Sequence, residues 1–512
     1  MSDIGKLAAD MAARGVASVF GITGSGATLT LLDELEKVGV RAVRTHFEGS
    51  AALMAGTVGR LSGRAGVAYG IKGPGFANLV PGLAASFLDA YPMVAVVEAY
   101  APGSTADKAH KRLDHASLAQ AVTKGGRFLS PDGPGFDALA GWAESEVPGP
   151  VLLELGGKVP PQAPVPVGAA AAPVSEPLMA LVARARRPVV IAGTLAVRKG
   201  WGEALSRLGL PVFSSAAAKG VLDETAPMAA GVYTGVGLEL TPESRLLPQA
   251  DLVVGLGLRP NEMLATKPFP CAAVNIDPVA VPGAEAFAFA ATATELPADL
   301  WQALAQHSWG LDQLQDTLAS LQRTLQHGFL PGRAFASIAQ TLGRSVRLVM
   351  DTGYFCTIGE HAWSAPRADL CLFSGQGRYM GTAVPMALGA AIHDPATPVV
   401  AVAGDGGIGM YLGEMRLAVE RRLPVLLVLM TDGRFGSIST RAIKDGLTRA
   451  PLEIGNPSWM PIMQGFGLPC WRANNLDELH AALGSWNPGG GPGYLEIAFD
   501  AEPYERMCNK IR

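Results

Sequence analysis

The sequence predicts an α/β protein made of three doubly wound domains with parallel sheets. Short apolar runs suited to buried strands alternate with stretches of helical periodicity along the whole chain. The length of 512 residues suggests about three domains, and two shifts in composition divide the chain accordingly. A hydrophobic content of 49% with 17% charged residues gives each part enough apolar material for a buried core.

The first composition shift, Lys158–Pro177, is rich in proline and alanine and is typical of a semi-rigid linker. The second lies near residues 330–333, after a polar helical run over residues 309–326. The expected domains are residues 1–160, 176–308 and 331–512.

Strands are expected where apolar runs end in turn residues. In the first part these are residues 18–21, a strand near Val43, and residues 67–71, 94–97 and 151–155. In the middle part they lie in RPVVIAGTLA, DLVVGLGLRPNE and AAVNID, and the third part opens with VRLVMDTGY. No short-period repeat is present, so at most the three parts are similar folds.

Charge and the amino-terminal segment exclude several classes of partner. A net charge of -4 provides no large basic field for nucleic acid or an anionic membrane. The segment MSDIGKLAADMAARG lacks a basic start followed by an apolar core, and the longest apolar run, Pro424–Met430, is far shorter than the ~20 residues that span a bilayer. The five cysteines show no CxxC spacing, so neither a zinc pattern nor a disulfide framework is indicated. We therefore expect a soluble, cytoplasmic protein.

The segment from residue 399 to 437 carries the strongest chemical signal. Val399–Ala403 suits a buried strand, Gly404-Asp405-Gly406-Gly407 a close turn, Met410–Arg422 a helix, and Pro424–Met430 a second strand. Ligands of open parallel sheets bind beyond the carboxyl ends of the strands, where Asp405 and Asp432 are expected to converge. Two carboxylates at one point require a cation.

Gly404, Gly406 and Gly409 also fit the GxGxxG pattern of nicotinamide dinucleotide folds. In that fold backbone amides approach the pyrophosphate directly, and Asp405 inside the turn would repel it unless a divalent ion lay between. The aspartate therefore favours a diphosphate held through magnesium, which commonly bridges carboxylate and phosphate oxygens. A solvated turn without a ligand is the remaining alternative.

With these residues in view, the chain resembles the thiamine-diphosphate-dependent family that includes acetolactate synthase, benzoylformate decarboxylase and pyruvate oxidase. The similarity covers essentially the whole length and implies pyrimidine-binding, middle and diphosphate-binding domains in that order. In the family, Mg²⁺ is held by the GDG aspartate, by the second residue of an Asn-Asn pair and by a main-chain carbonyl two residues later. The resemblance thus implies Asp405, Asp432 and Arg434 as metal ligands. Here Thr431-Asp432 replaces Asn-Asn, and a second carboxylate predicts tighter magnesium binding.

A second marker, RTHFEGSAALMAGTVGR, resembles the family segment in which a glutamate follows a strand and begins a helix. Glu48 occupies that position. The resemblance implies that Glu48 bonds to N1′ of the cofactor's aminopyrimidine and activates it, and an apolar site favours the protonated carboxyl that this requires. The alternative is that Glu48 merely stabilises the first turn of its helix.

Two further segments resemble the family. GPGFANL from Gly73 is expected mainly to pack the domain and line the site. In SGQGRYMGTAVPMALGAAI from Ser374, Met380 takes the place of the apolar residue that separates the two cofactor rings, although a core methionine is the alternative. The main-chain carbonyl of Arg378 is implied to accept from the cofactor's 4′-amino group. The expected cofactor-binding residues are Glu48, Gly353, Arg378, Met380, Gly404, Asp405, Gly406, Gly407 and Asp432.

Two residues are candidates for contact with substrate. FGITGS resembles a family loop, which places Ser25 where benzoylformate decarboxylase has a substrate-contacting serine; a plain turn residue is the alternative. Lys72, in GIKGPG, lies where relatives carry serine or histidine, and its cation suits a substrate carboxylate or an oxyanion. Alternatively, the stem of Lys72 packs and its amine reaches water.

The resemblance implies decarboxylation of a 2-oxo acid, followed by protonation of the product or its transfer to a second carbonyl compound. The paired histidines of pyruvate decarboxylases are missing, and Ile438 occupies the position of their late catalytic glutamate. This favours a carboligase of the acetolactate synthase type. The alternatives are a non-oxidative decarboxylase that releases an aldehyde, an enzyme that cleaves a diketone, and a non-catalytic member of the family.

The resemblance also bears on other ligands and on assembly. The region around Arg259 is similar to one that binds FAD or another adenine nucleotide in some members; FAD is not expected here, although a vestigial pocket is compatible with the sequence. In the family, the residues corresponding to Glu48 and Asp405 meet across two chains. At least a homodimer, or a homotetramer, is therefore implied.

Overall fold

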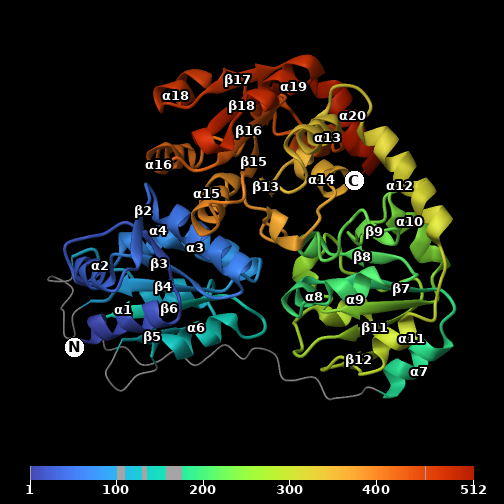
Figure 1. The fold of residues 1–512 in the computed structure, drawn as a ribbon, viewed down its shortest axis with the longest axis horizontal. Coiled ribbons are helices and arrows are strands. Elements are labelled where there is room, and N and C mark those ends of the chain that lie inside the picture. Colours follow the sequence, from blue (N-terminus) through green and yellow to red (C-terminus); the bar gives the residue numbers. More distant parts are fainter. Residues whose placement is uncertain (1, 101–109, 130–134, 157–175, 456, 512) are drawn as a thin grey trace. The chain divides into compact units, whose positions relative to one another are not determined.

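The computed structural model describes residues 2–100, 110–129, 135–156, 176–455 and 457–511. It contains three sheets of six strands each, all parallel and flanked by helices (Figure 1). The predicted α/β class with parallel sheets is confirmed. Most of the predicted linker, Lys158–Pro177, lies outside the described residues.

The chain forms two compact units. The first comprises Met1–Val167, Val384–Ala396 and Tyr411–Pro424, and the second comprises Gly168–Ala383, Thr397–Met410 and Val425–Arg512. The first sheet belongs to the first unit, and the other two sheets belong to the second.

The first sheet has the order β2-β1-β3-β4-β6-β5. Its strands are β1 (Ser18–Gly21), β2 (Arg41–Arg44), β3 (Gly66–Gly70), β4 (Met93–Glu98), β5 (Gly126–Phe128) and β6 (Pro150–Leu155). One core is formed with α1 (Asp3–Ala13), α2 (Ala27–Lys37) and α6 (Phe136–Glu144). Two long helices, α3 (Glu48–Ser62) and α4 (Pro74–Leu88), pack on each other, and α3 also packs on β3. This unit further contains α5 (His115–Gln120), most of α15 (Ala383–His393), the 3₁₀ helix η6 (Leu412–Glu414) and α16 (Met415–Arg421).

The middle sheet has the order β12-β11-β10-β7-β8-β9. Its strands are β7 (Pro188–Ala192), β8 (Val212–Ser214), β9 (Ala229–Val232), β10 (Leu252–Leu256), β11 (Ala272–Ile276) and β12 (Ala291–Ala293). Numbered within the sheet, this is the 3-2-1-4-5-6 order of dinucleotide-binding folds, read from the other edge. The surrounding helices are α7 (Glu176–Arg184), α8 (Thr194–Arg198), α9 (Gly202–Ser206), α10 (Pro242–Leu246), α11 (Leu300–Leu304) and α12 (Leu311–Leu325).

The third sheet has the order β14-β13-β15-β16-β18-β17. Its strands are β13 (Arg347–Met350), β14 (Cys371–Phe373), β15 (Val399–Gly404), β16 (Val425–Thr431), β17 (Cys470–Ala473) and β18 (Gly493–Ala498). Its helices are α13 (Pro331–Leu342), α14 (Tyr354–Ala362), α17 (Gly436–Lys444), α18 (Met460–Gly465), α19 (Leu476–Ser485) and α20 (Ala501–Ile511). Numbered within each sheet, the first and third sheets share the order 2-1-3-4-6-5, whereas the middle sheet differs. The similarity of fold among the three parts is therefore confirmed for two of them.

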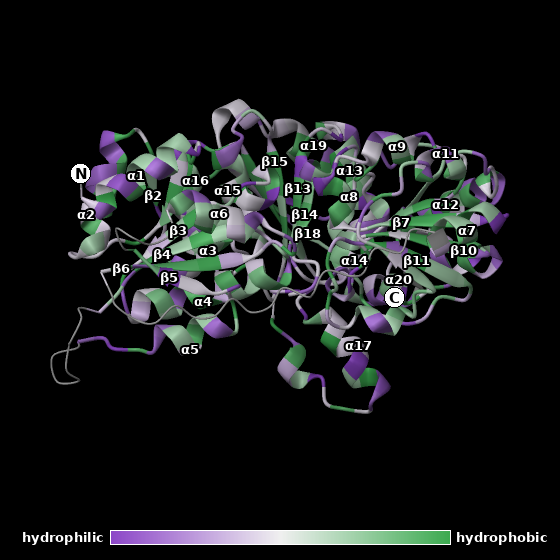
Figure 2. Ribbon diagram, turned by 90° about the horizontal axis from the view of Figure 1, so that it is seen from below, coloured by the Kyte–Doolittle hydropathy of each residue, from purple (hydrophilic) through white to green (hydrophobic). Residues whose placement is uncertain are grey.

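The central strands are apolar on both faces, as parallel sheets covered by helices require. All residues of β4 and β16 are buried. Figure 2 shows that the strands in the middle of the sheets are mostly hydrophobic. No helix in the described part of the chain is both long enough and apolar enough to cross a membrane.

Two expectations about elements were wrong or incomplete. The helix expected at Met410–Arg422 begins only at Met415, because the chain first makes a turn and the 3₁₀ helix η6. Seven of the described strands were not predicted: β5, β8, β9, β12, β14, β17 and β18. All of them except β18 have three or four residues, and such short strands carry little periodicity.

Candidate active site

In the first unit, three neighbouring strands carry the predicted site residues. Glu48 follows β2, Ser25 follows β1 and Lys72 follows β3, and these strands lie in the order β2-β1-β3. The order of the sheet reverses between β1 and β3, which is where ligands bind in open parallel sheets. Residues from three separate segments are thereby gathered at one edge.

Glu48 is the first residue of α3, and it is 7% exposed. Its Oε2 atom accepts a hydrogen bond of 3.0 Å from the side-chain amide of Asn78 on α4. The first turn of α4 also approaches closely, because a Cβ atom on Gly75 would lie 3.4 Å from Oε1 of Glu48. The carboxyl of Glu48 is thus held against the neighbouring helix α4. An acid that only stabilised the first turn of α3 would not need this contact.

The site in this unit includes a buried pair that the sequence did not reveal. Nδ1 of His115 lies 2.6 Å from Oε1 of Glu154, and Nε2 accepts a hydrogen bond of 2.9 Å from the backbone N–H of Gly73. Because Nε2 accepts, the hydrogen resides on Nδ1 and is donated to Glu154. The pair fixes Gly73, whose φ of 67° and ψ of -112° form the turn between Lys72 and α4.

The two candidate substrate contacts are accessible. Ser25 is exposed in the loop before α2. Lys72 is half-buried, and no hydrogen bond or ion pair joins its amine to another residue in the described part of the chain. A half-buried cation without an anionic partner suits a ligand that brings its own negative charge.

In the second unit, Asp405 follows β15 and Asp432 follows the adjacent strand β16. Oδ1 of Asp405 accepts from the hydroxyl of Thr431 at 2.5 Å, and Oδ2 accepts from the backbone N–H groups of Asp432 and Gly433 at 2.9 and 3.1 Å. Thr431, which replaces the expected asparagine, thus orients the first carboxylate.

The electrostatics at these two carboxylates suit a cation. Burial raises the pKa of Asp405, and burial followed by the charge of Asp405 raises the pKa of Asp432 to about 6. Each ionised carboxylate disfavours the ionisation of the other. A bound divalent ion that prefers hard oxygen ligands would compensate this repulsion. The described residues contain no group of three or more His, Cys, Asp or Glu side chains that could hold a metal ion, and the main-chain carbonyl of Arg434 is the further ligand that the sequence predicts. The donor set fits magnesium.

The turn at Gly404–Gly407 is closely packed and excludes side chains. A Cβ atom on Gly407 would lie 2.0 Å from Oδ2 of Asp351, and one on Gly406 would lie 2.4 Å from the ring of Phe435 and 3.4 Å from Sδ of Met380. Asp351, at the end of β13, was missed by the sequence analysis. It accepts from the N–H groups of Gly381 and Thr352, both at 2.8 Å, and burial raises its pKa to about 7.

Met380 is 37% exposed beside this turn, so it is not a core methionine. Arg378 adopts a left-handed φ of 46°, and its side chain turns back to the carbonyl of Gly375 at 3.0 Å and to the buried Glu360 at 3.2 Å. Gly353 is the residue before α14 and lies two positions after Asp351 in the sequence. These residues follow β13 and β14, so they share one edge of the third sheet with Asp405.

The nicotinamide alternative does not agree with the topology. The classic dinucleotide strand order occurs in the middle sheet, whereas the GxGxxG pattern lies in the third. A cavity of about 440 Å³ lies at the ends of β10 and β11, lined by residues that include Leu258, Asp277 and Phe289. Asp277 there accepts from the buried Arg259 at 2.7 and 2.9 Å. A vestigial pocket in this domain stays a prediction.

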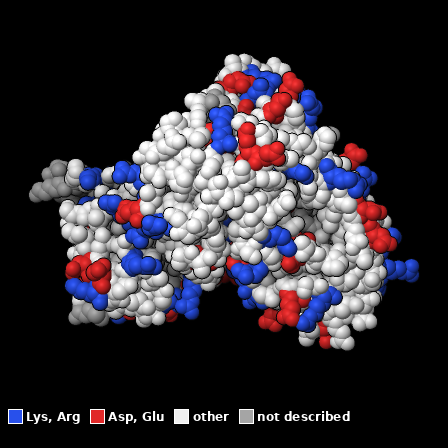
Figure 3. Space-filling model, turned by 45° about the horizontal axis from the view of Figure 1, so that its top comes forward, with Lys and Arg blue, Asp and Glu red and all other residues white. Residues whose placement is uncertain are grey.

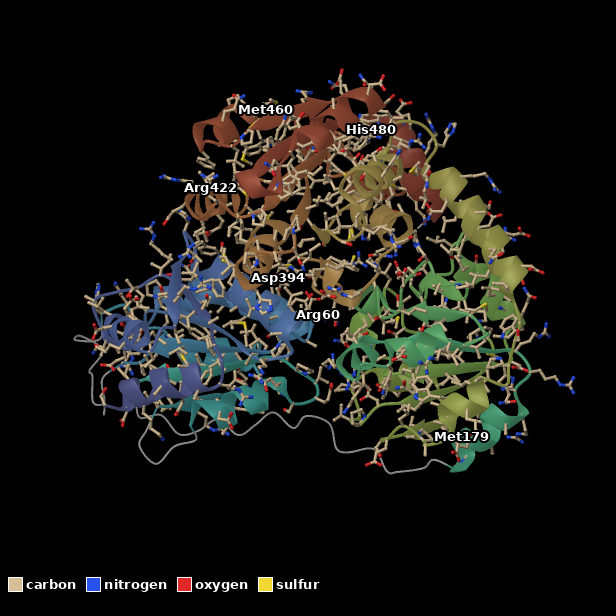
Figure 4. The ribbon with its side chains drawn as sticks, viewed as in Figure 1. Arg60, Met179, Asp394, Arg422, Met460 and His480 are labelled. Carbon is tan, nitrogen blue, oxygen red and sulfur yellow. The ribbon has the colours of Figure 1, made fainter. Side chains whose placement is uncertain are left out.

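The surface shows no large field of one sign on the face displayed in Figure 3, where acidic and basic side chains are intermixed. Figure 4 shows side chains filling the space between the elements of each sheet.

Comparison with known families agrees with this geometry. Residues 4–118 match the thiamine pyrophosphate enzyme N-terminal TPP binding domain, residues 176–295 the central domain, and residues 351–497 the C-terminal TPP binding domain. The three matches follow the order of the three sheets.

Relatives match along nearly the whole chain. The catabolic acetolactate synthase of Raoultella terrigena is 26% identical, with 96% of this chain and 94% of the relative covered. A probable 2-ketoarginine decarboxylase of Pseudomonas aeruginosa is 29% identical, with 94% and 91% covered. The acetolactate synthase isozyme 1 large subunit of Escherichia coli is 26% identical, with 96% and 92% covered.

Proposed function

Because the chain belongs to the thiamine pyrophosphate enzymes, we propose that it decarboxylates a 2-oxo acid and transfers the acyl unit to a second carbonyl compound. The observation that carries this proposal is the pairing of Asp405 and Asp432 at the ends of adjacent strands, where a magnesium ion and a diphosphate fit. The coarser description, a thiamine-diphosphate-dependent enzyme of the carboligase or decarboxylase kind, agrees with the relatives above.

Asp405, Asp432 and the main-chain carbonyl of Arg434 hold the magnesium ion. Gly353, Gly404, Gly406 and Gly407 would leave room for the diphosphate. Met380 would contact the cofactor rings, and the carbonyl of Arg378 would accept a hydrogen bond from the 4′-amino group. When bound, thiamine diphosphate supplies a carbon nucleophile and an electron sink. Glu48 holds and moves a proton at N1′ of the aminopyrimidine, and Asn78 orients its carboxyl.

Lys72 and Ser25 bind the substrate in this proposal. The amine of Lys72, which has no hydrogen-bond or ion-pair partner among the described residues, attracts the carboxylate of the 2-oxo acid. The exposed hydroxyl of Ser25 orients this substrate. Lys72→Met keeps much of the stem and removes the charge, so KM for a 2-oxo acid is expected to rise at least about tenfold. Steady-state kinetics with Lys199→Met, an exposed lysine of the middle domain, is the control. Unchanged kcat and KM in Lys72→Met would refute this role.

A carboligase is favoured over a simple decarboxylase because Ile438 occupies the site where an acid would protonate the product. Ile438 lies on α17 and is 55% exposed. The decarboxylase alternative is kept, since one relative has that name. Product analysis with 2-oxo acids, thiamine diphosphate and Mg²⁺, with and without an acceptor aldehyde or 2-oxo acid, separates the two. Release of aldehyde that no acceptor diminishes would exclude the carboligase.

We further propose that the active site forms between two chains. We also propose that the enzyme is cytoplasmic and contains no FAD. Glu48 and Asp405 belong to different compact units of one chain, and the family resemblance pairs them across chains. Glu48→Gln and Asp405→Asn variants should each be inactive. A dimer that contains one of each has one intact site, so mixing and exchanging chains should restore roughly a quarter of the activity. A mixture that stays inactive despite proven chain exchange would contradict the shared site.

A further inference from the structure

Glu414 is a buried acid that no role above uses. It is the last residue of η6, nine positions after Asp405 in the sequence, and 1% of it is exposed. Its Oε1 atom accepts hydrogen bonds from the backbone N–H groups of His46 at 3.0 Å and of Phe47 at 3.1 Å, and Oε2 lies 3.3 Å from Nδ1 of His46. Glu414, His46 and Phe47 belong to the first unit, and Asp405 belongs to the second.

These bonds lie at the corner where β2 turns into α3. Phe47 is the N-cap residue of α3, and its own side chain caps nothing. The first N–H groups of a helix lack partners within it, and a carboxylate is a favourable acceptor for them. Glu414 therefore caps α3 from another segment, directly before Glu48.

Two more contacts join the same segments. The rings of Phe47 and Tyr411 lie 6.1 Å apart, and Arg44 forms an ion pair of 3.5 Å with Glu420 on α16. In Figure 1, α16 lies next to β2, and the labelled Arg422 in Figure 4 marks its end. The exposed ion pair contributes little stability, whereas the buried carboxylate of Glu414 satisfies two backbone groups at once.

We propose that Glu414 is a positioning residue that sets the direction of Glu48 and links it to the occupancy of the Asp405 turn of the same chain. The segment that carries Glu414 follows that turn directly in the sequence, so the chain connects the turn to the acid that holds the start of the Glu48 helix. This inference rests on the proposed function, in which the two residues serve two different active sites of one dimer.

The test compares Glu414→Gln, which keeps an amide oxygen as acceptor, with Glu414→Ala, which removes it. Glu420→Gln, on the same segment but exposed, is the matched control. Hydrogen exchange of the His46 and Phe47 amides in protein without cofactor should accelerate about tenfold or more in Glu414→Ala, because a buried hydrogen bond to a charged group is lost. Glu414→Gln should lie between it and the wild type, and Glu420→Gln should match the wild type.

Coupling is tested with Mg²⁺ and inorganic pyrophosphate as the probe. These should slow exchange at His46 and Phe47 in the wild type but not in Glu414→Ala. In the loaded enzyme, Glu414→Ala should lower kcat about tenfold, while the affinity for thiamine diphosphate changes less than twofold, and Glu414→Gln should restore part of kcat. Wild-type exchange rates at both amides in Glu414→Ala, or an equal effect of pyrophosphate in the two proteins, would overturn the proposal. A wild-type protein that binds no thiamine diphosphate would instead refute the proposed function, since the exchange experiment without cofactor does not depend on it.

Discussion

The side-chain amide of Asn78 donates a 3.0 Å hydrogen bond to Oε2 of Glu48, so two helices that start from different strands meet at one carboxyl. Asn78 lies one turn into α4 and Glu48 begins α3. Asn78 therefore orients the carboxyl of Glu48.

Replacing Asn78 tests this relationship. Asn78→Ala removes the donor, and we expect kcat/KM to fall about tenfold, in line with about 1.5 kcal/mol for a hydrogen bond to a charged group. Asn487→Ala, which changes an exposed residue whose Oδ1 accepts from the backbone N–H of Gly489, is the control. An unchanged kcat/KM would show that the bond between Asn78 and Glu48 has no part in catalysis.

Asp432 is expected to be a direct ligand of the metal. Asp432→Asn removes one of two carboxylates that face the ion, so magnesium affinity should fall at least about tenfold, while the metal-free protein gains stability because the repulsion from Asp405 disappears. Titration of Mg²⁺ in the presence of thiamine diphosphate measures the first effect, and thermal unfolding without metal measures the second. Unchanged magnesium affinity would exclude Asp432 from the ligand set.

The raised pKa of Asp351 predicts that the free energy of unfolding depends on pH. Burial raises its pKa from 3.8 to about 7 in the native state, so between these values the native protein binds more protons than the unfolded chain. The free energy of unfolding should therefore decrease as pH rises from about 4 to about 7, by at most about 4 kcal/mol for a shift of this size. Asp351→Asn does not titrate, and its unfolding in urea should depend less steeply on pH than that of the wild type. Equal slopes would contradict the prediction.

His115 and Glu154 are expected to act as one unit that holds the turn at Gly73. His115→Phe keeps an aromatic ring beside Phe76 and Tyr100 but leaves the N–H of Gly73 and the carboxylate of Glu154 without their partner. We expect a loss of about 1–3 kcal/mol in the free energy of unfolding for each group left unpaired, together with a rise in KM because Lys72 precedes this turn.

The double variant His115→Phe/Glu154→Leu should lose less stability than the sum of the two single variants, since it no longer leaves a buried charge unpaired. Denaturant unfolding measures all three proteins, and His480→Phe in the third domain is the control. Strict additivity would show that the two residues act independently.

The sequence by itself determined the α/β class, the strands that carry long apolar runs, and the residues that follow them. Asp405 and Asp432 were singled out because they lie just after apolar runs, at the expected carboxyl ends of strands, and Glu48 because its segment resembles one of the family. Local pattern is sufficient there, since strand and turn propensities depend on neighbouring residues.

Only the tertiary structure revealed the partners of these residues. Asn78, His115 and Glu414 lie 30, 67 and 366 positions from Glu48 in the sequence, yet each acts on Glu48 itself or on the turns beside it. Asp351 likewise reaches the Gly404–Gly407 turn only because β13 and β15 pair in parallel. No local pattern encodes such contacts, because the order of strands in a sheet is decided by how helices and strands pack and not by their spacing along the chain.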